Sequence, residues 1–132
     1  KVVCVSQDAT IEEAARLMHD SDVSGLPVLK NGHLVGQINR TMMLAAFIEE
    51  MGLQLDSSRI TLELDDTPGQ ILNITQIVKD FGLNIVSIAT FFPEPTNKRL
   101  VVFRVKTSDP KPVESALRAA GYKIVTAADF GL

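Results

Sequence analysis

The stretch Ser58-Arg59-Ile60-Thr61-Leu62-Glu63-Leu64-Asp65-Asp66-Thr67-Pro68-Gly69-Gln70-Ile71 decides the fold of the second half of the chain. Its apolar residues at positions 60, 62 and 64 alternate with polar ones, which predicts a strand with one buried face. Thr67 then suits a helix N-cap, Pro68 suits the first helical position, and Gln70 completes the spacing of a capping box. The stretch therefore predicts a strand that is followed closely by a helix.

The residues that follow predict the rest of a ferredoxin-like unit. A helical apolar stripe runs to Phe81 and stops at Gly82, and a second helix opens at Asp109-Pro110 and ends at Gly121. Further strands are expected at residues 84–92, 100–106 and 123–128. The order β-α-β-β-α-β predicts an antiparallel sheet with both helices on one face.

The first half predicts the order β-α-β-β-α, so the fold class is α+β. A short β-branched strand at residues 2–5 is followed by Thr10 and Glu13, which have the spacing of a capping box. Asn31-Gly32 is the strongest short signal for a hairpin turn. A second helix starts near Arg40 and ends at Gly52. Its expected buried stripe consists of Leu44, Phe47, Ile48 and Met51.

Composition excludes several classes of protein. The chain has 132 residues with 13 Lys plus Arg and 16 Asp plus Glu, a net charge of −3, which argues against a nucleic-acid partner. The single cysteine, Cys4, excludes an intramolecular disulfide. The longest uncharged apolar run, residues 41–48, is far too short to span a membrane. The first residues lack the pattern of a secretory signal, so we expect a cytoplasmic protein with no membrane partner.

Two sets of motifs resemble known domain families. Residues 1–52 resemble one CBS motif, through the runs Asp8-Ala9-Thr10-Ile11, Val23-Ser24-Gly25-Leu26-Pro27-Val28 and Asn31-Gly32-His33-Leu34-Val35-Gly36. Residues 59–132 resemble an ACT domain, through Asp66-Thr67-Pro68-Gly69-Gln70-Ile71 and Gly82-Leu83-Asn84-Ile85, with residues 53–58 as a linker. The combination resembles the C-terminal part of the CBS–CBS–ACT proteins, which include the acetoin-utilisation accessory protein family. It implies half of a CBS module followed by a ferredoxin-like ACT domain.

The ACT resemblance implies an effector site at the loop between the first strand and the first helix, where a small metabolite, usually an amino acid, binds. Helix-start amides are expected to hold its carboxylate, and an aspartate is expected to accept its ammonium group. The amide of Asn84 is expected to lie nearby, at the entry of the second strand. The expected effector-binding residues are Asp65, Asp66, Thr67, Pro68, Gly69, Gln70 and Asn84. The alternative interpretation is that the Pro-Gly pair only caps the helix.

The CBS resemblance implies a cleft for an adenine nucleotide. The candidate residues are Ser24, Leu26, Pro27, Asn39 and Arg40. The position of the family's ribose-binding aspartate holds Met42, and a thioether cannot accept the ribose hydrogen bonds as a carboxylate does. Arg40 is a candidate phosphate ligand, against the ordinary alternative of a solvated arginine. We therefore expect nucleotides to bind weakly or not at all.

The remaining candidates favour neither a catalytic nor a metal site. His19 lies beside Asp20 and near Asp22, but neighbouring positions at a helix end do not converge on one ion. Cys4 lies in an apolar strand, which predicts a small buried side chain. The sequence contains no Ser/His/Asp set, P-loop or dinucleotide fingerprint, so we expect neither an enzyme nor a bound cofactor.

Association with a second copy is expected from size and apolarity. A unit of about 50 residues buries too little surface to be stable alone, and the resemblance implies that CBS motifs pair. The strand at residues 84–92 has more apolar side chains than one layer of helices can cover, so the rest are expected to be covered by a second copy. The leading hypothesis is a regulatory module, homodimeric or larger, that binds a small metabolite and controls a partner. The alternative is a structural adaptor that oligomerises and binds no metabolite.

Overall fold

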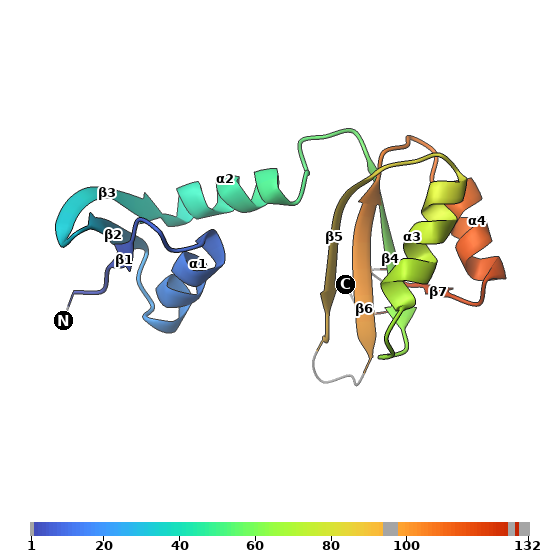
Figure 1. The fold of residues 1–132 in the computed structure, drawn as a ribbon, viewed down its shortest axis with the longest axis horizontal. Coiled ribbons are helices and arrows are strands. Elements are labelled where there is room, and N and C mark those ends of the chain that lie inside the picture. Colours follow the sequence, from blue (N-terminus) through green and yellow to red (C-terminus); the bar gives the residue numbers. More distant parts are fainter. Residues whose placement is uncertain (1, 94–97, 127–128, 130–132) are drawn as a thin grey trace. The chain divides into compact units, whose positions relative to one another are not determined.

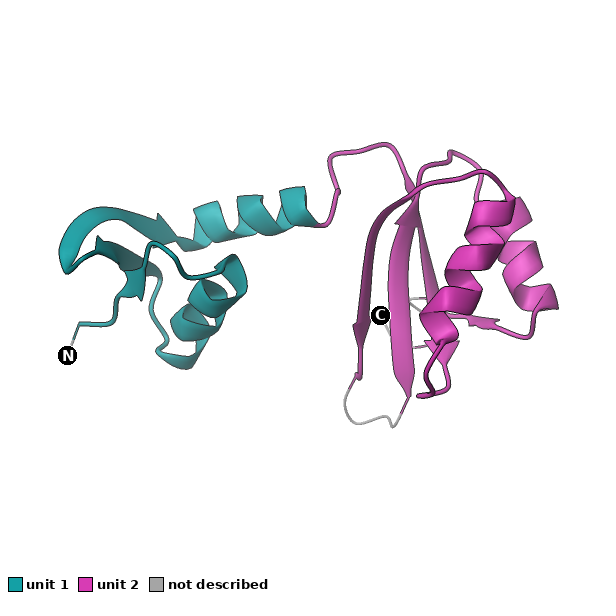
Figure 2. Ribbon diagram, in the orientation of Figure 1, with its two compact units in different colours: residues 1–50 teal, residues 51–132 magenta. Residues whose placement is uncertain are grey.

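The chain forms two compact units, Lys1–Glu50 and Met51–Leu132 (Figure 2). The computed structural model describes residues 2–93, 98–126 and 129. Each unit has its own cluster of buried apolar side chains. Residues 53–58, the expected linker, fall within the second unit.

The first unit has a three-stranded sheet with the order β1-β2-β3, and β1 is parallel to β2 while β2 is antiparallel to β3 (Figure 1). The element order confirms the predicted β-α-β-β-α. Its elements are β1 (Val5–Ser6), α1 (Ile11–Asp20), β2 (Gly25–Lys30), β3 (His33–Asn39) and α2 (Arg40–Glu50).

Two local predictions for this unit are confirmed. The backbone N–H of Glu13 donates to Thr10 Oγ1 at 3.1 Å, and the N–H of Thr10 donates to Glu13 Oε2 at 2.8 Å, so the capping box is complete. Asn31 and Gly32 have φ angles of 50° and 78°, as a type I′ hairpin turn requires. Both features fix the start of α1 and the register of β2 with β3.

The predicted buried stripe of α2 is wrong for Leu44 and Ile48 and is confirmed for Phe47, which is partly buried. Met43 is the side chain of this helix that is buried in the core, and Phe47 packs partly against the same cluster. Leu44 and Ile48 are 63% and 39% exposed. Because the helix is apolar on nearly all sides, its sequence does not distinguish which side faces the sheet.

The prediction that Cys4 is buried is also wrong. Its side chain is exposed. The reason is that β1 begins only at Val5, so Cys4 precedes the paired part of the strand, and it is Val5 that enters the core.

The second unit confirms the ferredoxin-like prediction. Its sheet has the order β5-β6-β4-β7, all neighbours are antiparallel, and α3 and α4 cover one face (Figure 1). Its elements are β4 (Ser58–Leu64), α3 (Gln70–Asp80), β5 (Ile85–Phe91), β6 (Arg99–Val105), α4 (Lys111–Ala119) and β7 (Lys123–Ile124). Residues 127–128 of the expected last strand lie outside the described residues.

The core of this unit lies between the sheet and the two helices. The buried apolar face predicted for β4 is confirmed, since Ile60, Leu62 and Leu64 are buried, but Thr61 on the other face is buried as well. They pack with Phe103 of β6, which is fully buried, and with residues of both helices. Within the described residues, no helix is long and apolar enough to cross a membrane.

The predicted capping box at the start of α3 is wrong. The N-cap is Gly69, in the left-handed conformation with φ of 90°, and no side chain caps the helix there. Thr67 Oγ1 instead accepts a hydrogen bond of 2.8 Å from Gln70 Nε2. The chain makes a turn through Pro68 and Gly69 before the helix begins, and glycine adopts this conformation at little cost.

Candidate functional site

A hollow of about 450 Å³ lies where β4 ends and α3 begins. We call it the β4–α3 hollow. It combines the end of β4, the first turn of α3, and the turn between α4 and β7, because β7 is antiparallel to β4 and Lys123 pairs with Glu63. It is lined by Glu63, Leu64, Asp65, Gln70, Asn73, Ala120, Gly121, Tyr122 and Lys123.

Neutral hydrogen-bonding groups are among the residues that line the hollow. The hydroxyl of Tyr122 donates to Gln70 Oε1 at 3.4 Å, while Gln70 Nε2 donates to Thr67 Oγ1. These two bonds orient the Gln70 amide. The carboxylate of Asp65 is exposed and has no ion-pair partner among the residues that the structure describes. The hollow therefore offers one unpaired negative charge, Asp65, beside neutral donors and acceptors and beside the ion pair of Glu63 with Lys123.

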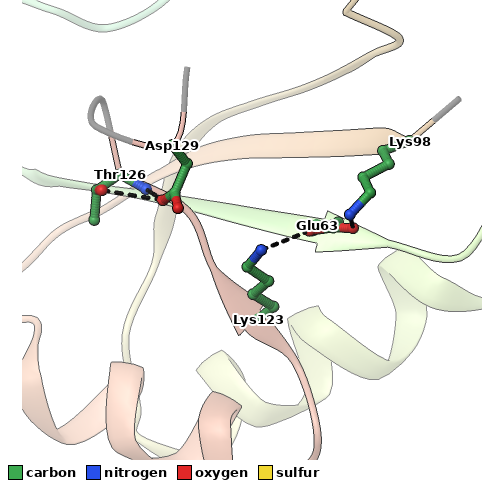
Figure 3. Close-up of polar contacts among 5 residues, drawn as sticks. All are labelled: Glu63, Lys98, Lys123, Thr126 and Asp129. Atoms are coloured by element: carbon green, nitrogen blue, oxygen red, sulfur yellow. Dashed lines mark hydrogen bonds and ion pairs between the residues drawn. The ribbon is translucent and has the colours of Figure 1, made fainter. Parts of the chain in front are cut away.

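Glu63 lies between two lysines that approach it from different sides (Figure 3). Lys98 Nζ binds Glu63 Oε1, and Lys123 Nζ lies 3.4 Å from Glu63 Oε2. The Glu63 side chain is only 20% exposed. Lys98 first, and Lys123 after it, hold the pKa of this carboxyl below its ordinary value.

These contacts predict an acid-dependent loss of stability. The lowered pKa means that Glu63 stabilises the folded state fully above its ordinary value near 4.5, and that this contribution disappears as the pH falls through the folded-state pKa. Glu63→Gln is expected to be less stable than the parent at neutral pH by up to roughly 1 kcal/mol. The two proteins should become equally stable in strong acid. Urea unfolding of both proteins across the acid range measures this, and a difference that persists below the folded-state pKa would contradict it.

The structure brings only part of the expected effector set to the hollow. Asp65 and Gln70 line it. Asp66 instead forms an ion pair with Arg99 at 3.5 Å. The N–H of Thr67 donates to the carbonyl of Asp65 at 2.9 Å, and Pro68 has no N–H, so two of the expected loop amides are not free for a ligand.

The expected position of Asn84 beside this loop is wrong. Asn84 lies at the other end of α3, in a separate hollow with Thr75 and Lys79. Ser58 and Ile85 both pair with Val105, so β4 and β5 begin at the same end of the sheet. The helix that follows β4 must therefore run back to that end before Asn84, away from the β4–α3 hollow.

The candidate nucleotide residues of the first unit are engaged in the fold. The N–H of Met42 donates to Asn39 Oδ1 at 2.8 Å, so Asn39 caps the first turn of α2. Arg40 lies 3.9 Å from Asp22, and its N–H donates to the carbonyl of Ser24. Leu26 is buried in the core, and Pro27 is paired in the sheet opposite Gln37.

Asn73, Tyr122 and Lys123 line the hollow but were not expected from the sequence. A partial signal was present, because Gly121 ends a predicted helix just before a predicted strand. The first residues of that strand reach the end of β4 only because the two strands pair in antiparallel register, Glu63 with Lys123. No metal-binding group of three or more His, Cys, Asp or Glu is found in the described part of the chain.

Comparison with known families decides the relationship. Residues 57–127 match the TTHA0829-like ACT domain family, and this match covers more than half of the chain. The chain belongs to this ACT family. Residues 1–49 match the CBS domain family. The resemblances inferred from the motifs are thus confirmed at the level of these two domain families, and we refer to the two units as the CBS unit and the ACT unit.

Two solved structures are similar to parts of the chain. One is the regulatory subunit of aspartate kinase from Thermus thermophilus in its ligand-free form, with 24% identity and a TM-score of 0.45, covering 54% of this chain and 50% of that one. The other is a signal-transduction protein with CBS domains from Burkholderia ambifaria MC40-6, with 30% identity and a TM-score of 0.36, covering 38% of this chain and 37% of that one. This chain therefore spans half or less of either protein.

Proposed function

We propose that the protein is a regulatory ligand-sensing module whose ACT unit binds an amino acid in the β4–α3 hollow and thereby controls a partner. CBS and ACT domains are regulatory, which supports a role without catalysis. The observation that carries the proposal is the position of the hollow, at the junction of the first ACT strand and first ACT helix. It holds an unpaired carboxylate, Asp65, for an ammonium group.

The proposal extends to the organisation of the chain. We assign residues 1–52 to the CBS motif and 59–132 to the ACT domain, joined by residues 53–58, which fold with the ACT unit. The order of a CBS motif before an ACT domain also supports assignment to the acetoin-utilisation accessory proteins. For adenine nucleotides the support is weaker, because Asn39 is used as a helix cap and Arg40 lies near Asp22.

Ligand binding separates this proposal from a purely structural adaptor. A ligand that binds only the folded state raises the melting temperature by mass action. A thermal-shift screen of the parent chain with the standard L-amino acids is expected to give at least one such rise. If none of them raises the melting temperature, the adaptor hypothesis takes the place of the sensor.

Asp65→Asn is expected to weaken the binding of the amino acid found in that screen by roughly 1.5–3 kcal/mol, because it removes a charge-assisted bond to the ammonium group. Calorimetric titration measures the loss. The matched control is Asp56→Asn, since Asp56 lines a different hollow with Ser58 and Lys106 at the start of β4. Equal affinities for both variants and the parent would place the amino acid elsewhere.

We further propose that the CBS unit associates with a second copy of this chain. Its exposed apolar side chains include Leu44, at 63% exposure, and Leu34, at 69%. A unit of about 50 residues gains most of its missing burial by pairing. The expected assembly is a homodimer or a larger oligomer.

Light scattering is expected to give a mass above the 14.4 kDa of one chain, and Leu44→Glu is expected to lower it towards that value. A glutamate in an apolar interface loses its hydration without gaining a partner, so association should weaken. Leu72→Glu, on the exposed side of α3, is the matched control and should leave the mass unchanged. A parent chain that stays at 14.4 kDa at all concentrations would overturn the proposal.

A further inference from the structure

The β4–α3 hollow contains charges of both signs. Asp65 contributes an unpaired carboxylate, and Lys123 contributes an ammonium group whose side chain is 61% exposed. Gln70 and Tyr122 add neutral groups that are already bonded to each other. A ligand that fits this set has an ammonium group and an anionic group, with hydrogen-bonding or small substituents between them.

The single negative charge of Glu63 is paired with two lysines, so one of them can be released while Glu63 keeps a partner. Lys98 and Lys123 both contact the same carboxylate. Lys98 is the closer of the two, and the Lys123 contact is 3.4 Å long. Lys98 lines a second hollow, of about 160 Å³, together with Pro93 and Leu100, and does not line the β4–α3 hollow. Lys123 lines both.

Asp129, which lines the second hollow together with Lys123, is already engaged. Asp129 Oδ2 accepts hydrogen bonds from the N–H of Thr126 at 2.7 Å and from its hydroxyl at 3.0 Å (Figure 3). Lys123 can therefore turn towards the β4–α3 hollow while Glu63 stays paired with Lys98. No buried charge is left without a partner by this movement, which keeps its cost small.

We propose that Lys123 binds the carboxylate of the amino-acid ligand, exchanging its contact with Glu63 for one with the ligand, while Asp65 accepts the ligand's ammonium group. This inference rests on the proposed function and adds the residue that recognises the carboxylate. It moves the anionic end of the ligand away from the loop amides of residues 67–70, two of which are not free. Phosphate is disfavoured, because a dianion would lie close to Glu63 and Asp65.

Lys123→Gln and Lys98→Gln form a matched pair for the test. Each removes one lysine from Glu63, and the two side chains have nearly equal exposure, 61% and 57%. The ligand probe is the L-amino acid with the largest thermal shift on the parent chain, together with its α-carboxamide, which lacks the negative charge. Circular dichroism establishes that each variant is folded, and Lys123→Arg tests whether the charge alone restores binding.

Lys123→Gln is expected to weaken binding of the amino acid by about tenfold or more, and Lys123→Arg should recover most of it. Lys98→Gln should weaken binding less, because it keeps Lys123 but leaves Glu63 without its second lysine. The carboxamide should bind the parent and Lys123→Gln equally weakly, which a general loss of structure would not produce. Equal losses in the two glutamine variants, or no loss in Lys123→Gln, would overturn the role of Lys123 and leave the proposed function standing. If no amino acid binds the parent chain, the proposed function itself fails.

Discussion

Phe103→Ala is expected to lower the free energy of unfolding of the ACT unit by about 3–5 kcal/mol, the largest effect of any single substitution considered for this chain. Phe103 is fully buried on β6 and pairs with Ile60 on β4 and Ile88 on β5. Truncation removes an aromatic ring from the layer between the sheet and both helices, where the surrounding side chains relax only in part. Small domains are stable by about 5–15 kcal/mol in total, so this loss is at least about a fifth of the stability of the unit.

Phe92→Ala is the matched control, because Phe92 is 56% exposed. Its substitution is expected to change the stability by no more than about 0.5 kcal/mol. Denaturant unfolding followed by circular dichroism measures both values. A loss below roughly 1 kcal/mol for Phe103→Ala would mean that the core described around β6 does not form as stated.

The elements that sequence predicts well are those whose signal is local. The capping box at Thr10 and the hairpin at Asn31-Gly32 depend on residues no more than three positions apart, and both are confirmed. The apolar positions of β4 are also a local signal, because they recur at every second residue. They form the face that lies under the two helices. The prediction for the start of α3 is wrong because Thr67 and Gln70 have the spacing of a capping box but bond to each other through their side chains.

The candidate site depends on the pairing of β7 with β4, which the sequence does not predict. Asp65 and Gln70 come from one continuous stretch and were expected, but Tyr122 and Lys123 reach them only because β7 pairs with β4. Asn84 was misplaced for the same reason, since its end of the sheet follows from the register of β4 and β5 against β6. In α2, an apolar sequence on nearly every side left its buried face undetermined.

Gly52→Ala is expected to lower the free energy of unfolding of the ACT unit by about 2–5 kcal/mol, the second-largest effect. Gly52 has φ of 64°, which costs an alanine about 1–2 kcal/mol. A Cβ added there would also overlap with Val86 Cγ1 of β5, and such overpacking costs a further ~1–3 kcal/mol. The segment before β4 is thus held closely against the sheet.

The hydrogen bonds of this segment support the same conclusion. Leu55 donates its N–H to the carbonyl of Gly52 at 3.1 Å, and Ser57 Oγ donates to the carbonyl of Leu55 at 3.2 Å. Arg104 of β6 in turn donates from Nε to Ser57 Oγ at 2.8 Å. Residues 53–58, which the sequence predicts as a linker, are therefore bonded to the sheet through Ser57, while Gly52 just before them lies close to Val86.

Two further variants separate the overlap from the backbone cost. Gly82 has φ of 68° with nothing within 4 Å of an added Cβ, so Gly82→Ala should cost only the backbone part, about 1–2 kcal/mol. Val86→Ala, combined with Gly52→Ala, should recover part of the loss, because the smaller side chain removes the overlap. If Gly52→Ala and Gly82→Ala are equally destabilising and Val86→Ala recovers nothing, the segment moves aside freely. Residues 53–58 would then only join the two domains, which is all that the sequence predicts for them.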